Sequence, residues 1–260
     1  MRMADELLHW VRFREGGTER FGTIEGARVR AWEGTPFDDP QPGERTVPLA
    51  QVELLTPVQP SKVIALWNNF KALDEKLELP VPAEPLCLVK TPNTWLAPGG
   101  TILHPGRGLK VVFEGELGIV IGRVCRQVGE REAMAHVLGF TCANDVTVAD
   151  ILHRDASFPQ WVRAKGFDTF CPFGPCIATG LDPSGLRVRT LLDGQVRQDY
   201  PVSDMRFSVP QLVSLISQDM TLLPGDVILC GTSLGVGSMK PGSTVEVEIA
   251  GVGRLVNAVG

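Results

Sequence analysis

The sequence predicts a β-rich, mixed α/β fold in which a small N-terminal β domain precedes a larger domain. Near the N-terminus, three short segments alternate apolar and polar residues between glycine-containing turns, as in a β-meander: residues 11–14, 20–24 and 27–32. From residue 60 onward, strand patterns outnumber helical ones. The helical segments are too few to cover both faces of a parallel sheet, so we do not expect a doubly wound fold.

The chain next carries a loop and then a boundary. Residues 34–43 are so rich in Pro, Gly and Asp that they predict a loop. Residues 57–62 lead into an apolar strand at residues 63–66. We therefore expect residues 1–58 to form the small β domain and residues 59–260 to form the larger one.

The larger domain contains one long strand pattern and two helical ones. Residues 111–121 are mostly apolar and predict a single strand, and residues 130–138 predict a helix. The second helix is expected to start at Ser208 as N-cap, with Pro210 in its first turn. Its apolar face should contain Leu212, Leu215, Ile216 and Met220.

Turn-forming residues and alternating patterns predict the remaining strands. Asp-Gly at residues 193–194 is the commonest sequence of a tight hairpin turn. Residues 224–226 turn the chain into a strand at residues 227–230. Alternating patterns at residues 245–249 and 254–257 predict the last two strands.

Composition and charge exclude several classes of protein. The 260 residues are 43% hydrophobic and 21% charged, as in an ordinary globular protein. The net charge is −5 and no basic stripe is present, so we expect no nucleic-acid partner. We also expect no membrane association, because no stretch reaches the roughly 20 apolar residues of a membrane span. Six scattered cysteines without a CxxC pair and an N-terminus unlike a secretory signal favour free thiols and a cytoplasmic location.

Two glutamates stand two residues apart inside the apolar 111–121 segment. In a strand, Glu114 and Glu116 project from one face with Cα atoms about 6.6 Å apart, while Phe113 and Leu117 point the other way. Two buried carboxylates side by side repel each other and lose hydration. A divalent cation relieves both costs, and oxygen ligands favour Mg²⁺, Mn²⁺ or Ca²⁺. The alternative is an edge strand whose glutamates face water.

A third acid follows another apolar strand. Residues 139–145 end in Asn144-Asp145, and the end of a strand is a usual position for a metal ligand, although Asn-Asp is also ordinary turn chemistry. Together with the two glutamates, Asp145 completes the number of carboxylates expected for a hard cation that keeps positions open for substrate.

Five segments resemble, in order and spacing, the catalytic domain of the fumarylacetoacetate hydrolase family: FEGELGIVIGR, GFTCANDVT, AKGFDTFCPFGP, MTLLPGDVILCGTSLGVG and KPGSTVEVEIAGVGRLVN. The resemblance covers about residues 60–260. It implies a β-roll catalytic domain behind a small β domain, usually as a homodimer. It also implies Mg²⁺ or Mn²⁺ bound by Glu114, Glu116 and Asp145, which chelates the 2-oxo or enol oxygen and adjacent carboxylate of a pyruvyl-type substrate.

The resemblance implies further site residues. Lys165 matches the family lysine that points toward the substrate oxyanion, where a cation stabilises a developing enolate. Gly231 and Thr232 match the family's substrate-contacting Gly-Thr loop. The residue types alone also allow a surface lysine and a simple tight turn at these positions.

The chain departs from the hydrolytic members in two places. Their lid segment carries a water-activating histidine, whereas residues 65–76 contain none and offer Lys71, Asp74 and Glu75, which could also be an ordinary charged helix face. Ala149 and Leu152 stand where those members present an arginine and a glutamine to the substrate. Recognition of a substrate carboxylate must then come from elsewhere, with Arg154, Arg163 and Lys71 as candidates.

These departures favour the branch of 5-oxopent-3-ene-1,2,5-tricarboxylate decarboxylases and 2-hydroxyhepta-2,4-diene-1,7-dioate isomerases. We expect decarboxylation or tautomerisation of unsaturated 2-oxo or 2-hydroxy dicarboxylic acids through a metal-bound enolate, as in aromatic-compound catabolism. Lys165 would stabilise the enolate, and Glu75 or Lys71 would shuttle protons. The alternatives are a C–C bond hydrolase of acylpyruvates and a non-catalytic relative that only binds a metal or metabolite.

Overall fold

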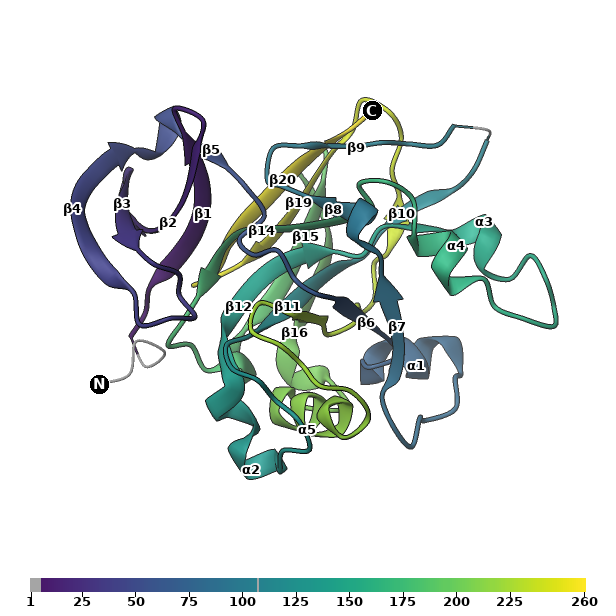
Figure 1. The fold of residues 1–260 in the computed structure, drawn as a ribbon. Coiled ribbons are helices and arrows are strands. Elements are labelled where there is room, and N and C mark those ends of the chain that lie inside the picture. The colour runs from purple at the N-terminus through teal and green to yellow at the C-terminus, as the bar shows by residue number, and fades with distance from the viewer. Residues whose placement is uncertain (1–5, 107) are drawn as a thin grey trace.

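Strands far outnumber helices in the computed structural model, which describes residues 6–106 and 108–260 (Figure 1). They form sheets of twelve, five and three strands, with parallel pairs among mostly antiparallel ones. This confirms the predicted mixed, β-rich class.

The N-terminal meander is confirmed and contains more strands than predicted. It consists of β1 (His9–Glu15), β2 (Thr18–Glu25), β3 (Arg28–Glu33), β4 (Gln41–Pro48) and β5 (Glu53–Leu54). The loop predicted at residues 34–43 is wrong at its end, because β4 begins at Gln41 and pairs Gln41 and Pro42 with β3. β4 is the edge of its sheet, where a proline costs no ladder hydrogen bond.

The meander continues into the largest sheet of the molecule. β1 pairs with β14, and the order runs β4-β3-β2-β1-β14-β12-β11-β17-β6-β7 (Figure 1). The strands beyond the meander are β6 (Val63–Trp67), β7 (Leu86–Lys90), β11 (Gly115–Ile121), β12 (Val137–Asn144), β14 (Cys171–Ala178) and β17 (Val227–Leu229), and β8 (Trp95–Leu96) pairs with β14 off this path.

A second sheet packs against the first. It consists of β16 (Gln195–Pro201), β15 (Arg187–Leu192), β19 (Thr244–Ile249), β20 (Gly253–Val259) and β9 (Thr101–Ile102), in this order. β12 packs on β19 and β20, and the largest apolar core fills the space between the sheets. The hairpin predicted at residues 193–194 is confirmed, since Asp193 and Gly194 join β15 to β16 with φ of 52° and 75°.

The predicted strand at residues 111–121 is two strands in different sheets. β10 (Val111–Phe113) pairs with β13 (Thr147–Val148) and β18 (Gly237–Ser238), whereas β11 joins the large sheet. Phe113 and Leu117 consequently pack into separate cores. The break falls on Glu114, so a continuous apolar pattern concealed a change of sheet.

The helices lie around the sheets (Figure 1). They are α1 (Lys71–Leu77), α2 (Glu130–Ala133), α3 (Ala149–Leu152), α4 (Trp161–Lys165) and α5 (Val209–Asp219), with 3-10 turns at Leu49–Gln51, Pro92–Thr94, Met134–His136, Pro183–Gly185 and Val202–Asp204. Among the residues described, no helix combines the length and apolar character needed to cross a bilayer.

Two helix predictions need correction. The helix predicted at residues 130–138 ends with the turn Met134–His136, because β12 takes up Val137 and pairs it with Ile121. α5 starts as predicted after Ser208, whose N–H donates to Gln211 Oε1 at 2.9 Å. Leu215 is 39% exposed and does not belong to its apolar face, and Met220 lies just past its end. The buried apolar residues of this helix are Val209, Leu212, Val213 and Ile216.

Candidate metal centre

Three carboxylates converge at the point where β11 begins and β12 ends. Glu114, Glu116 and Asp145 each offer an oxygen, and these oxygens lie within 4.8 Å of one another. The antiparallel register causes this, because Gly115 pairs with Asn144 and so sets Glu114 opposite Asp145. The Asp145 N–H donates to the Glu114 carbonyl at 2.9 Å.

The carboxylates are not a hydrated pair on an edge strand. β11 lies between β12 and β17, and Glu116 is fully buried. The side chain of Glu114 is 12% exposed, so Glu114 forms the solvent side of the cluster. Its backbone N–H donates to Asn144 Oδ1 at 3.0 Å, which satisfies the backbone where the two strands separate.

Lys165 lies inside the cluster. Its ammonium donates to Glu114 Oε2 at 2.8 Å and to Asp145 Oδ2 at 2.6 Å. A third bond reaches Thr147 Oγ1 at 2.7 Å, and Thr147 in turn donates to Glu114 Oε1 at 2.8 Å. Lys165 is 2% exposed, so the alternative of a surface lysine is wrong. Lys165 is the last residue of the short helix α4, which places its ammonium beside the acids.

Lys90 is a second buried cation, which the sequence pattern did not predict. It ends β7, its ammonium lies 2.7 Å from Asp145 Oδ1, and it donates to the Val146 carbonyl at 3.2 Å. A lysine at the end of the apolar run Leu-Cys-Leu-Val was a weak signal of a buried charge. Nothing in the spacing indicated that Asp145 is its partner.

The charges of the cluster are unevenly compensated. Burial tends to raise the pKa of Asp145, but Lys165 and Lys90 outweigh burial and lower it. Burial tends to lower the pKa of Lys165, but Asp145 and Glu114 outweigh burial and raise it. The pKa of Glu116 is raised well above its usual value by burial and then by Asp145 and Glu114. Glu116 is therefore the acid whose ionised form needs a further cation.

The unsatisfied oxygen of Glu116 fits a divalent ion. Its Oε2 accepts from the Gly231 N–H at 2.7 Å, but the buried Oε1 has no hydrogen-bond partner within the described ranges. Leaving such an oxygen unpaired is costly, and a hard cation with carboxylate ligands would satisfy it. Glu114, Glu116 and Asp145 together offer the all-oxygen ligand set that such an ion prefers.

The Gly-Thr loop is bound to the same strand. Gly231, whose φ is 87°, donates its N–H to Glu116 Oε2. Thr232 Oγ1 donates to the Gly115 carbonyl at 3.0 Å and accepts from Gln198 Nε2 at 2.8 Å. The loop is buried against β11, so it is more than a surface turn.

The lid candidates are not joined to the acids. Lys71 and Glu75 are exposed on α1, and in the described part of the chain neither makes an ion pair or hydrogen bond with the three carboxylates. Asp74 is buried and paired with Arg206. Arg154 and Arg163 line a common cavity of about 620 Å³ at α4, and its described walls include none of the three carboxylates.

Two known family models match the chain, one in its larger C-terminal part and one near its N-terminus. A family model described as the C-terminal region of fumarylacetoacetate (FAA) hydrolase matches residues 62–260. A second model, described as the N-terminal region of Rv2993c-like proteins, matches residues 8–57.

Three proteins with named activities resemble the chain over most of its length. The 2-hydroxyhepta-2,4-diene-1,7-dioate isomerase of Mycobacterium marinum is 40% identical with a TM-score of 0.89, covering 97% of this chain and 98% of that one. The mitochondrial oxaloacetate tautomerase FAHD2A of Bos taurus is 36% identical over 82% of this chain and 71% of its own. Maleylpyruvate hydrolase of Sphingobium sp. SYK-6, in complex with manganese(II) and pyruvate, is 26% identical with a TM-score of 0.80, covering 96% and 98%.

Proposed function

Because this chain belongs to the fumarylacetoacetate hydrolase family, a family of enzymes, we propose that it tautomerises or decarboxylates unsaturated 2-oxo or 2-hydroxy dicarboxylic acids. The observation that carries this proposal is the placement of Lys165 between Glu114 and Asp145, beside the unpartnered oxygen of Glu116. This arrangement joins a fixed positive charge to a site for a divalent cation.

The three acids would hold Mg²⁺ or Mn²⁺, with Ca²⁺ as a further possibility for an all-oxygen site. Such an ion supplies Lewis acidity toward the 2-oxo or enol oxygen of a substrate. Gly231 orients Glu116 through its N–H, and Thr232 fixes the same loop to the Gly115 carbonyl. The chain itself thus determines where the ligand oxygens point before any substrate enters.

Lys165 is suited to stabilise negative charge. Its raised pKa keeps the ammonium protonated near neutral pH, so it acts as a cation and not as a base. A buried ammonium stabilises a developing enolate oxygen more strongly than the neutral ketone, because water does not screen the interaction. Tautomerisation and decarboxylation both develop that charge.

The histidines offer little support for a hydrolase. His9, His104 and His136 bond to backbone groups at Gly251, Gly106 and Val124. Among the described residues, no hydrogen bond joins a histidine to the carboxylate cluster. Hydrolysis of an acylpyruvate C–C bond stays the second candidate, and the likeness to maleylpyruvate hydrolase favours it.

Product analysis tests the proposal. The purified protein, with Mg²⁺ or Mn²⁺, should interconvert the enol and keto forms of oxaloacetate or 2-hydroxyhepta-2,4-diene-1,7-dioate, or release CO₂ from a related tricarboxylate. The Glu116→Gln variant is the inactive control. Cleavage of an acylpyruvate into two acids, with neither tautomerisation nor CO₂, would favour the hydrolase. Full activity of the variant would refute the site, and binding without turnover would favour a non-catalytic relative.

The remaining parts of the proposal concern assembly and location. We propose a homodimer that acts on a small carboxylic acid, by analogy with the family, and a cytoplasmic location, which the free cysteines favour. Light scattering coupled to size-exclusion chromatography tests the dimer, and a single-chain mass would refute it.

A further inference from the structure

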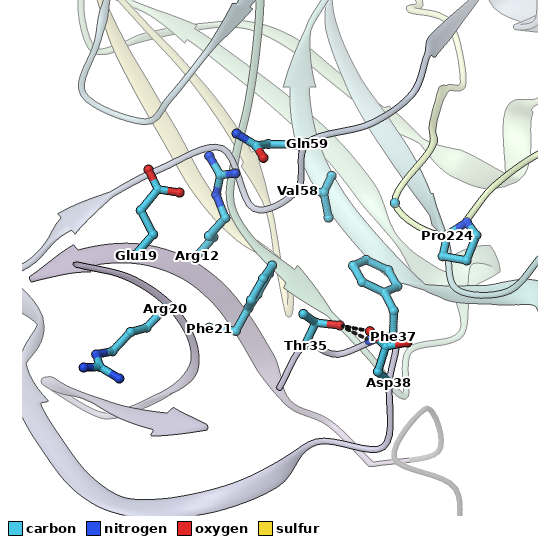
Figure 2. A pocket seen from close by; sticks show the side chains of 11 residues that line it. Arg12, Glu19, Arg20, Phe21, Thr35, Phe37, Asp38, Val58, Gln59 and Pro224 are labelled. Carbon is cyan, nitrogen blue, oxygen red and sulfur yellow. Dashed lines mark hydrogen bonds between the residues drawn. The ribbon is translucent and has the colours of Figure 1, made fainter. Parts of the chain in front are cut away.

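A second cavity lies where the N-terminal meander meets the larger domain (Figure 2). It has a volume of about 440 Å³, within the range of pockets for small molecules. Its described walls include none of the three carboxylates. Gly225, which lines it, precedes β17, whereas Gly231 at the metal centre follows β17, so the two sites lie at opposite ends of that strand.

Arg12 on β1 is the unusual residue of this cavity. It is 9% exposed, and its Nε has no hydrogen-bond partner among the described residues. The one side-chain hydrogen bond that it makes to the described residues is long, at 3.5 Å from Nη2 to Thr56 Oγ1. It forms no ion pair in residues 6–106 and 108–260. Burial accordingly lowers the pKa of its guanidinium.

The acids that line the cavity are already engaged. Glu19 pairs with Arg14 at 2.7 Å, and Asp38 accepts from Thr35 Oγ1 at 2.9 Å. Figure 2 shows the Arg12 guanidinium directed toward Gln59, while Arg20 extends away from it. The charge of Glu19 partly offsets the burial of the Arg12 guanidinium, but no ion pair joins the two side chains. A nearly buried guanidinium without an ion-pair partner in the described residues is costly, and its planar N–H fork matches a carboxylate of a ligand.

The opposite part of the cavity is apolar. Phe21, Phe37, Val58 and Pro224 line it, with Phe37 and Pro224 on the side away from Arg12 (Figure 2). Two aromatic rings favour a flat apolar body next to the charged end. Asp38, beside Phe37, would repel a second negative charge on the ligand.

From these contacts we propose that the cavity binds a small monocarboxylate with a flat apolar body, held by Arg12 and packed against Phe21 and Phe37. This ligand differs from the dicarboxylates proposed for the metal centre, so the site is additional to the proposed activity.

Fluorine NMR with 4-fluorobenzoate tests the site, with neutral 4-fluorobenzamide as the matched probe. We expect saturable binding of the acid with a Kd of about 1 mM and much weaker binding of the amide. Arg12→Met should weaken binding of the acid at least about tenfold, because the charge-assisted pair is lost. Arg126→Met removes the same charge from an exposed position outside the cavity and should change the affinity less than about threefold.

Further variants distinguish ligand binding at this site from binding at the metal centre, and a lost contact from misfolding. Glu116→Gln should retain binding of 4-fluorobenzoate, and loss of binding there would overturn the proposal. Arg12→Met should remain folded, because it removes an unpaired buried charge. If it does not fold, Arg12→Lys keeps the charge without the fork and should still weaken binding severalfold. Equal binding of acid and amide, or unchanged binding in the Arg12 variant that folds, would also overturn it.

Discussion

The Lys90 ammonium lies 2.7 Å from Oδ1 of Asp145, and both side chains are almost fully buried. Lys165 holds the other oxygen of the same carboxylate at 2.6 Å. Asp145 is thus fixed by two cations from different elements, β7 and α4. The two lysines have different surroundings, since Lys165 alone also bonds to Glu114 and Thr147.

Removal of Lys90 should mainly affect stability. Lys90→Met deprives the buried Asp145 of one cation, and breaking a buried ion pair costs about 3–5 kcal/mol of unfolding free energy. Urea denaturation measures the change. Lys76→Met, at an exposed position of α1, should change the unfolding free energy by less than about 0.5 kcal/mol. Equal stability of the two variants would contradict the structural role of Lys90.

Removal of Lys165 should lower stability, because it also breaks buried ion pairs, and should in addition lower turnover. Lys165→Met eliminates the positive charge that we propose stabilises the enolate, and loss of one such group lowers kcat by about 10²–10³-fold. Steady-state kinetics with saturating metal measures kcat, and Lys165→Arg should recover part of it because it keeps the charge. A variant that loses only substrate affinity, with kcat intact, would assign Lys165 to binding.

The sequence predicted the convergence of the three acids better than their surroundings. Glu114, Glu116 and Asp145 were recognisable because charge is rare inside apolar strands, and strand pairing joins them locally. Lys90 was missed because its contact with Asp145 depends on how distant strands are arranged. The break at Glu114 was missed for a related reason, since residues on both sides are apolar and only the sheets reveal the change. Leu215 fits the helical period but lies at the margin of the buried face.

Loss of a metal ligand should appear as a loss of metal-dependent stability. A bound ion at 100 times its Kd stabilises the folded state by about 2.7 kcal/mol, which raises Tm. Glu116→Gln should abolish the rise in Tm that Mg²⁺ or Mn²⁺ causes, and EDTA should have no further effect on the variant. Glu132→Gln, on an exposed face of α2, should retain the full shift. An unchanged shift in Glu116→Gln would show that the ion binds elsewhere.

Gly231 should affect the metal site through the backbone. An alanine there is strained at φ of 87°, and its Cβ would lie 3.2 Å from the Leu66 carbonyl oxygen. The loop must then shift, which displaces the N–H that orients Glu116, and such supporting contacts change metal affinity about 10–100-fold. Isothermal titration with Mn²⁺ measures the affinity. Gly242→Ala is a matched control, because its φ is 91° but nothing lies within 4 Å of the added Cβ. Equal affinities of the two variants would contradict this role.

The α1 residues provide the test of proton transfer. Asp74 pairs with Arg206 and Leu73 is buried, so α1 is anchored while Lys71 and Glu75, one turn apart, stay exposed. If either residue shuttles protons over a bound substrate, its removal should lower kcat by about 10²–10⁴-fold and leave metal affinity unchanged.

Exchange of the substrate C3 proton with deuterium measures this step directly. Glu75→Gln and Lys71→Met are each compared with a neighbour of the same charge, Glu78→Gln and Lys76→Met, which are also exposed. We expect one of the first two variants to lose exchange while both controls keep it, because a shuttle needs one titratable group within reach of the substrate and not a general surface charge. Normal exchange in both Glu75→Gln and Lys71→Met would exclude α1 as the proton shuttle and leave Glu114, the least buried acid of the cluster, as the next group to test.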